Sequence, residues 1–104
     1  MKLITKELEN RFQEIGDQTL SSNPIVVAKF INPRSDQFWY VTSYNRETGI
    51  CYGYVGGTDL KGWTTFSVHA LENLDKRLGF GIERDVYFKE IRFNQLVQDQ
   101  EQDR

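Results

Sequence analysis

Three short segments rich in β-branched and aromatic residues follow one another between residues 25 and 55, and they favour a sheet-based fold. They cover residues 25–31, 38–44 and 50–55. Residues 45–49 have the length and the glycine of a hairpin connection, and residues 62–66 form a short fourth segment. Successive strands joined by short loops pair as neighbours, so the sequence predicts an antiparallel meander.

Two stretches with helical periodicity flank these segments. The first follows Thr5, a good N-cap, and stops at Gly16, with apolar residues at Leu8, Phe12 and Ile15. The second follows the cap residue Ser67 and stops at Gly79, with apolar residues at Val68, Leu71, Leu74 and Leu78. The sequence therefore predicts two amphipathic helices that pack on the sheet.

The last part of the chain is predicted to be a strand followed by a tail. Residues 85–89 alternate like a final strand, and residues 95–104 are almost wholly polar and charged. A segment of that composition buries too little apolar surface to offset the cost of ordering it. The predicted fold is α+β: an antiparallel sheet of four to five strands in a meander with two helices packed on it. Residues 1–94 form a single domain, and residues 95–104 form a disordered C-terminal tail.

Composition is typical of a small soluble protein. Of the 104 residues, 38% are hydrophobic and 13% aromatic, which is enough for a core without disulfides, and the single Cys51 excludes an internal disulfide. No segment approaches the roughly 18 consecutive apolar residues of a membrane span. The N-terminus has no apolar run of signal-peptide length. We therefore expect a cytoplasmic protein with no membrane partner.

The charge balance bears on nucleic-acid binding. Thirteen Lys and Arg residues against fifteen Asp and Glu residues give a formal net charge of −2. Duplex-binding modules usually carry a basic excess, because neutralising phosphates supplies most of their non-specific affinity. Nucleic acid is thus a disfavoured partner, although a local patch of cations is compatible with this total.

Side chains alternate across a strand, so each predicted strand presents two sets of residues. One set is small or aliphatic apart from Trp39, as expected beneath a helix. The other set places four tyrosines in a band on one sheet face if the pairing register holds: Tyr40, Tyr44, Tyr52 and Tyr54. Either a helix covers this band, since tyrosine is ordinarily half-buried, or the band is exposed and binds a partner, since tyrosine is enriched at interface hot spots.

Few residues are candidates for chemistry. His69 is the only histidine and has no second ligand for a metal, so we expect it to face solvent. Cys51 belongs to the apolar set and is expected to be a buried thiol. We expect Arg84, within the charged residues 83–85, to pair with a carboxylate or to bind backbone carbonyls, with ligand contact as the alternative. The sequence offers no catalytic residue set, no metal site and no cofactor.

Several stretches resemble one family over nearly the whole chain. They include residues 1–8, 27–30, 52–55 and 66–72, and the most specific lies over residues 78–88, with a glycine turn followed by Ile82-Glu83-Arg84-Asp85. This pattern, which runs from Met1 to about Phe88, resembles DUF2958, a family of small bacterial proteins of unknown function. The chain departs from the pattern at Phe80-Gly81, where Leu-Pro is usual, and at Val68-His69-Ala70.

The resemblance implies a setting and no mechanism. Proteins of this family look like accessory products of plasmids, conjugative elements and phages, and genes in that setting often act against host defence or assist transfer. No catalytic residue set is established for the family, so none is carried over to this chain.

The leading hypothesis is a non-enzymatic protein-interaction module of a mobile element that binds a host or element protein. The tyrosine band would make the contact, with Arg84 at its rim, and inhibition of a restriction or CRISPR system is one concrete form. On this hypothesis, Tyr40→Ala together with Tyr52→Ala leaves folding intact.

Two alternatives belong to other classes. The first is a nucleic-acid-binding accessory protein that stacks bases on the aromatic rings and contacts phosphates through Lys29, Lys61, Arg84 and Arg92. The second is an enzyme, which would have to use Glu83, Asp85 and His69 together.

Overall fold

The first helix forms where the sequence predicts it. The computed structural model describes residues 2–78 and 81–102, and helix α1 spans Lys6–Ile15. The Thr5 hydroxyl accepts a hydrogen bond from the Leu8 N–H at 3.2 Å, which satisfies one of the unpaired donors of the first turn. Gly16 ends the helix at a φ of 79°, and its N–H donates to the Phe12 carbonyl. A left-handed residue of this kind favours glycine.

The predicted meander is also confirmed. Strands β2 (Ala28–Ile31), β3 (Phe38–Asn45), β4 (Ile50–Gly56) and β5 (Gly62–Ser67) pair in sequence order, and β6 (Glu83–Arg84) adds to β2. The five-stranded antiparallel sheet therefore has the order β5-β4-β3-β2-β6. The fold class is α+β, as expected.

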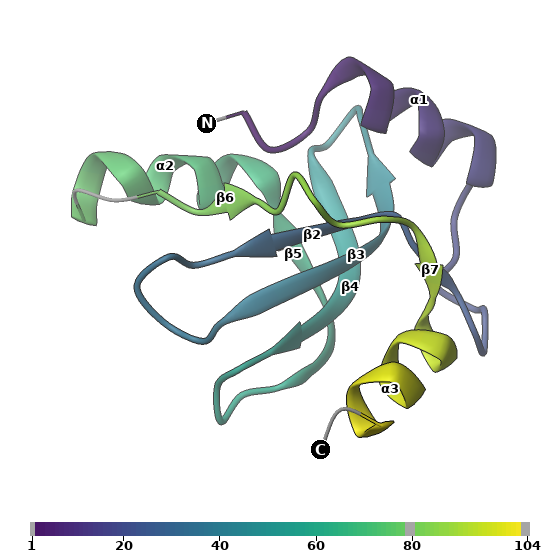
Figure 1. Ribbon diagram of the computed structural model, residues 1–104. Helices are drawn as coiled ribbons and strands as arrows, with labels where there is room; N and C mark the ends of the chain where they lie inside the picture. Colours follow the sequence, from purple (N-terminus) through teal and green to yellow (C-terminus); the bar gives the residue numbers. More distant parts are fainter. Residues whose placement is uncertain (1, 79–80, 103–104) are drawn as a thin grey trace.

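Helix α2 (Val68–Leu78) follows β5 directly and connects the two edges of the sheet. The Ser67 hydroxyl caps it by accepting the Ala70 N–H at 3.2 Å. Figure 1 shows α1 and α2 together along one side of the sheet, with α3 at the far end of the molecule beside β7. The predicted terminating residue, Gly79, lies outside the described residues.

The segment predicted as one strand over residues 25–31 is divided. β1 (Ile25–Val26) leaves the main sheet and pairs with β7 (Ile91–Arg92) in a separate two-stranded sheet, whereas β2 stays in the main sheet. Between them, the Val27 N–H donates to the Val41 carbonyl. The division is not visible in a continuous β-branched run, because its cause is pairing with residues far along the chain.

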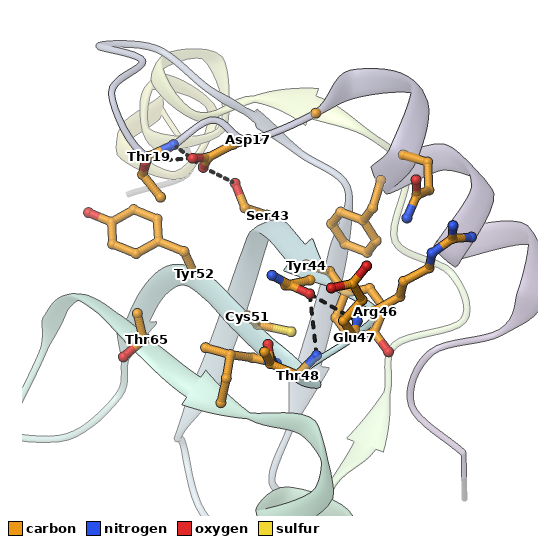
Figure 2. A pocket seen from close by; sticks show the side chains of 15 residues that line it. Asp17, Thr19, Ser43, Tyr44, Arg46, Glu47, Thr48, Cys51, Tyr52 and Thr65 are labelled. Atoms are coloured by element: carbon orange, nitrogen blue, oxygen red, sulfur yellow. Dashed lines mark hydrogen bonds between the residues drawn. The ribbon is translucent and has the colours of Figure 1, made fainter.

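Strand β3 contains a β-bulge at Thr42. Val41 faces Gly53 and Ser43 faces Tyr52, so Thr42 is the extra residue between these two pairs. The Thr42 side chain is fully buried and donates to the Tyr52 carbonyl at 3.1 Å. Figure 2 shows the next residue, Ser43, with its hydroxyl facing the Asp17 carboxylate.

Buried Gln18 fills the space that the bulge and the strand break create. Its Nε2 group donates to the carbonyls of Ile25 and Thr42 at 2.8 and 2.7 Å, and its Oε1 atom accepts the Ile25 N–H at 2.8 Å. Its own N–H donates to the Ser43 hydroxyl at 2.8 Å. One side chain thus satisfies the backbone groups that the ladder leaves unpaired, as buried polar groups require.

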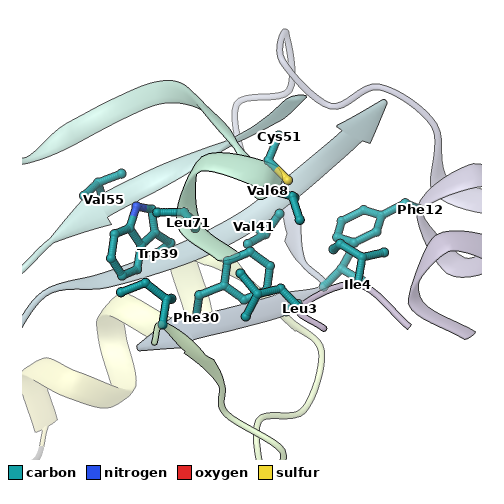
Figure 3. Packing of buried hydrophobic residues seen from close by; sticks show 13 residues of the cluster. Leu3, Ile4, Phe12, Phe30, Trp39, Val41, Cys51, Val55, Val68 and Leu71 are labelled. Carbon is teal, nitrogen blue, oxygen red and sulfur yellow. The ribbon is translucent and has the colours of Figure 1, made fainter. Parts of the chain in front are cut away.

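The core lies between the sheet and helices α1 and α2. Phe30, Trp39, Val41, Cys51 and Val55 rise from the sheet to meet Phe12 of α1 and Val68 and Leu71 of α2. Figure 3 shows Leu3 next to Phe30 and Ile4 next to Phe12. The N-terminal segment therefore belongs to the core, and Leu3 is fully buried.

Two long-range hydrogen-bonded contacts hold this N-terminal segment in place. The Leu3 N–H donates to the Glu72 carboxylate of α2 at 2.9 Å. Arg84 of β6 donates to the carbonyls of Lys2 and Leu3 at 2.9 and 3.0 Å. Charged groups bonded to backbone in this way give stronger hydrogen bonds than neutral pairs do.

The C-terminal predictions require two corrections. Residues 85–89 do not form a strand: the pairing residues are Glu83 and Arg84, and the chain then turns, with the Tyr87 N–H donating to the Asp85 carboxylate at 3.0 Å. Residues 95–102, which the sequence predicts to be a disordered tail, lie in helix α3, which spans Phe93–Gln102. Two hydrogen bonds hold its start: the Phe93 N–H donates to the Pro24 carbonyl, and the Asn94 N–H donates to the Asn23 side chain. A domain boundary at residue 94 would fall inside α3.

Replacing Gln18 should destabilise the protein more than its size suggests. Gln18→Ala leaves buried backbone groups of Ile25 and Thr42 unpaired, so the free energy of unfolding should fall by about 2–4 kcal/mol. Gln18→Glu keeps the shape but removes the NH₂ donor, and it should also destabilise. Urea denaturation measures both, with the exposed Gln13→Glu as control. Equal stabilities for Gln18→Glu and Gln13→Glu would contradict this role.

Candidate functional site

A row of large side chains crosses four strands on the sheet face that α1 and α2 leave open. Lys29 on β2 faces Tyr40 on β3, Tyr40 faces Tyr54 on β4, and Tyr54 faces Trp63 on β5. On three of these strands the residue adjacent to the row belongs to the core: Phe30, Trp39 and Val55. Because side chains alternate across a strand, the row lies on the opposite face.

The row ends in a group of four rings that we term the Trp63 cluster: Tyr52, Tyr54, Trp63 and Phe93. The Trp63 ring stacks on Tyr52 at 5.8 Å between centroids, meets Tyr54 edge-on at 5.6 Å and meets Phe93 edge-on at 4.7 Å. These are the offset and edge-to-face arrangements that aromatic quadrupoles favour. Trp63 remains 38% exposed, and the two tyrosines are half-buried.

The other end of the row is covered. Tyr40 is only 3% exposed, and its ring lies 4.7 Å from Phe38 and 6.1 Å from Phe88 between centroids. Lys29 places its ammonium 5.5 Å from the Phe38 ring and 5.6 Å from the Tyr40 ring. Figure 1 shows the segment between β6 and β7, which contains Phe88, passing beside β2 and β3. An irregular segment, not a helix, therefore covers this part of the face.

Two residues of the predicted site lie elsewhere. Because the bulge at Thr42 shifts the register by one residue, Tyr44 faces Cys51 and its ring packs 5.8 Å from Phe12 on the helix-covered side. Burial there raises the pKa of Tyr44. Arg84 donates to the backbone carbonyls of Lys2 and Leu3 at the sheet edge. Bonding to backbone carbonyls is one of the structural roles expected for this residue from the sequence. Of the predicted tyrosines, Tyr40, Tyr52 and Tyr54 share a face.

A hollow of about 630 Å³ lies at the end of the β3–β4 hairpin, next to the last turn of α1. Figure 2 shows Tyr52 and Thr65 on one side of it and Arg46 and Glu47 on the other. The hairpin loop is ordered by Asn45, whose carboxamide oxygen accepts the N–H groups of Glu47 and Thr48 at 2.9 and 3.3 Å. Sequence reasoning missed this hollow because the bulge and the α1 end that form it are joined only in three dimensions.

A smaller hollow of about 230 Å³ adjoins the Trp63 cluster. Tyr52, Trp63 and Phe93 line it together with Gln18 and residues of the 19–24 loop. Thr19 and Tyr52 line both hollows, so the two hollows are neighbours. The smaller hollow therefore borders the exposed Trp63, and the larger hollow begins beyond Tyr52.

The residues considered for chemistry do not converge. His69 is the second residue of α2, is exposed, and lies against Gly49 of the hairpin. Glu83 and Asp85 are on and after β6, at the opposite edge of the sheet. Within residues 2–78 and 81–102, no three His, Cys, Asp or Glu side chains are grouped as metal ligands would be.

Cys51 is a buried thiol, as expected. It is almost completely inaccessible, and burial raises the pKa of this thiol to about 12. A protonated sulfur in the core is a poor nucleophile at neutral pH.

Comparison with known proteins gives one match. Residues 3–97 match the model of a family described as "Protein of unknown function (DUF2958)". The match begins two residues after the start of the resemblance, at Leu3, and extends past Phe88 into the start of α3. No curated protein and no solved structure matches the chain. No helix among the described residues has the length and apolar character to cross a membrane.

Tyr40 and Trp63 should differ in their effect on stability although they share one row. Tyr40→Ala removes a covered ring and should lower the free energy of unfolding by about 3–5 kcal/mol, as for other buried aromatic residues. Trp63→Ala should cost about 1–2 kcal/mol, because its ring is partly in water and loses mainly ring contacts. Urea denaturation of the two variants tests this. A Tyr40→Ala variant as stable as Trp63→Ala would contradict the covered position of Tyr40. It would agree instead with the hypothesis that Tyr40 belongs to an exposed binding band.

The Cys51 thiol should make stability fall at alkaline pH. Its pKa is 9.0 when exposed and about 12 when folded, so the unfolded chain loses the proton first as the pH rises. The stabilisation from the buried neutral thiol is complete below pH 9 and is lost between pH 9 and 12. Urea denaturation across this range should show a shallower decline for Cys51→Ala than for the wild type. Identical slopes would contradict the assignment.

Proposed function

The chain belongs to the DUF2958 family of proteins of unknown function, and from this premise we propose that it is a non-enzymatic module that binds a protein partner through the Trp63 cluster. The observation that carries the proposal is the 38% exposed Trp63, which is held in place by Tyr52, Tyr54 and Phe93 on an open sheet face. Tryptophan and tyrosine are the residues most enriched at interface hot spots. Fixed rings also lose little conformational entropy when a partner binds.

The cations favour a protein partner over a nucleic acid. Of the four that a nucleic-acid site would use, Lys29 lies over the Phe38 and Tyr40 rings, and Arg92 donates to the Asn23 carbonyl at 3.0 Å. Arg84 donates to the carbonyls of Lys2 and Leu3. Lys61, two residues before Trp63, is exposed, and Arg92 is exposed beside Phe93 while it makes its carbonyl contact. An aromatic surface without a row of cations lacks the phosphate contacts that supply most nucleic-acid affinity.

A non-enzymatic role is supported by the separation of the titratable residues. An enzyme built on His69, Glu83 and Asp85 would need them within hydrogen-bonding reach of one substrate. They lie instead at opposite edges of the sheet, and the Asp85 carboxylate accepts the Tyr87 N–H.

The proposed partner is a protein of the host cell or of the mobile element that carries the gene. This part of the proposal rests on the family resemblance, which implies plasmids, conjugative elements and phages as the setting. A component of a restriction or CRISPR system is the concrete case, and the chain would inhibit it by covering a surface that it needs.

Affinity capture from a lysate of the host tests the proposal. Three tagged forms are compared: the wild type, the double variant Tyr52→Ala/Trp63→Ala, and the control Tyr87→Ala. Tyr87 is an 89% exposed tyrosine away from the Trp63 cluster, so its removal matches the loss of a surface ring. We expect the wild type and the control to retain the same protein, identified by mass spectrometry, and the double variant to lose it. Circular dichroism of the double variant checks that it is folded.

Parallel arms with and without nuclease separate the partner classes. Retention in both arms, with loss in the double variant, supports a protein partner. Recovery only without nuclease would replace the proposal with nucleic-acid binding. Retention that the double variant does not reduce, or no retention by the wild type, would overturn it.

A further inference from the structure

The two edges of the main sheet differ in how they are protected. β6 is a two-residue edge made of Glu83 and Arg84, and short charged edges are a common defence against unwanted strand pairing. β5 at the other edge is six residues long and contains neither a charged residue nor a proline. Among the described strands it pairs with β4 alone. Alternate residues of such a strand direct both N–H and C=O away from the sheet, where only another extended backbone matches them.

Exposed apolar side chains gather along the same edge. Leu60, just before β5, is 90% exposed, and Trp63 within it is 38% exposed. Ile50 is 39% exposed and lies on β4 directly opposite Ser67, at the end of β5. These are three of the six large apolar side chains that the structure describes as exposed, the others being Leu20, Val86 and Tyr87. Apolar exposure concentrated along an unpaired strand marks an interaction site.

We propose that the β5 edge pairs with the β5 edge of a second copy of this chain, antiparallel about a two-fold axis perpendicular to the sheet. Such an axis keeps each face of the sheet on its own side, so residues that face each other must be an even number of positions apart. Centring the pairing on Thr64 meets this condition and places Trp63 opposite Thr65 of the other copy. It also leaves Ser67 outside the pairing, where its hydroxyl caps α2.

A second copy fits this edge because the edge is complementary to itself. Leu60 lies at one end of the β5 edge and Ile50 lies at the other end. Antiparallel pairing therefore places Leu60 of each copy near Ile50 of the other copy. The residues of β5 bear no charge, and threonines directly opposite each other form favourable cross-strand pairs. The net charge of −2 adds little repulsion between copies.

Pairing in this way extends the aromatic surface. The two Trp63 clusters come to lie on the same face of one continuous sheet, on either side of the two-fold axis. The dimer would thus present one enlarged aromatic surface. The pairing itself concerns the isolated chain and does not depend on the partner proposed above.

Sedimentation velocity of the purified chain over a range of concentrations tests the pairing. We expect the apparent mass to rise from 12.2 kDa toward twice that value as the concentration increases. Thr64→Lys places two like charges beside the axis and should weaken dimerisation roughly fivefold or more. Thr64→Glu should do the same, and an equimolar mixture of the two variants should recover the dimer. Asn10→Lys makes the same change of charge at an exposed position on α1 and should leave dimerisation unchanged.

Amide hydrogen exchange of the wild type gives a readout that needs no variant. Protection of residues 62–67 should rise with concentration, whereas protection at β6 should not. A monomer at every concentration would overturn the proposal. So would a dimer that Thr64→Lys does not weaken, or one whose formation leaves exchange in β5 unchanged.

Discussion

The hydrogen bonds of Gln18 are the interaction on which the rest of the structure depends. This side chain bonds to Ile25 at the strand break and to Thr42 at the bulge, two places where the backbone leaves the regular ladder. Burying those groups unpaired would cost several kcal/mol. The break lets β1 leave the main sheet for β7, and the bulge turns Tyr44 toward the helices. Both features define the open face, so the backbone beneath the candidate site depends on one loop glutamine, which also lines the smaller hollow.

The open face has two parts because two different elements approach it. The segment after β6 brings Phe88 onto Tyr40, which makes that end part of the interior. Phe93, the first residue of α3, lies at the side of Trp63 and leaves the Trp63 ring partly in water. The same row of residues therefore has a structural end and an accessible end. The tyrosine band of the sequence becomes a smaller surface in which tryptophan is the central residue.

Local signals predicted the elements well, and long-range contacts account for the errors. Thr5, Gly16 and Ser67 mark helix ends, and the residues around Gly49 mark a hairpin, because each acts through neighbours a few positions away. The position of Tyr44 was wrong because counting by twos along a strand fails after a bulge. α3 was missed because its first turn is held by Asn23 and Pro24, about 70 positions earlier. Trp63 was left out of the site because the short fourth segment was not assigned to either face. The family resemblance and the α+β class needed none of these details.

The path of α2 from one edge of the sheet to the other has a consequence for how the molecule assembles. Strands β2 to β5 are joined by short loops and pair with their neighbours in the sequence. Strand β6 can pair with β2 only after α2 has crossed the sheet. Arg84 then binds the Leu3 carbonyl across 81 positions of sequence. Contacts of such separation carry the largest loop-closure cost and form late. We therefore expect the N-terminal segment and β6 to dock together, after the meander has formed.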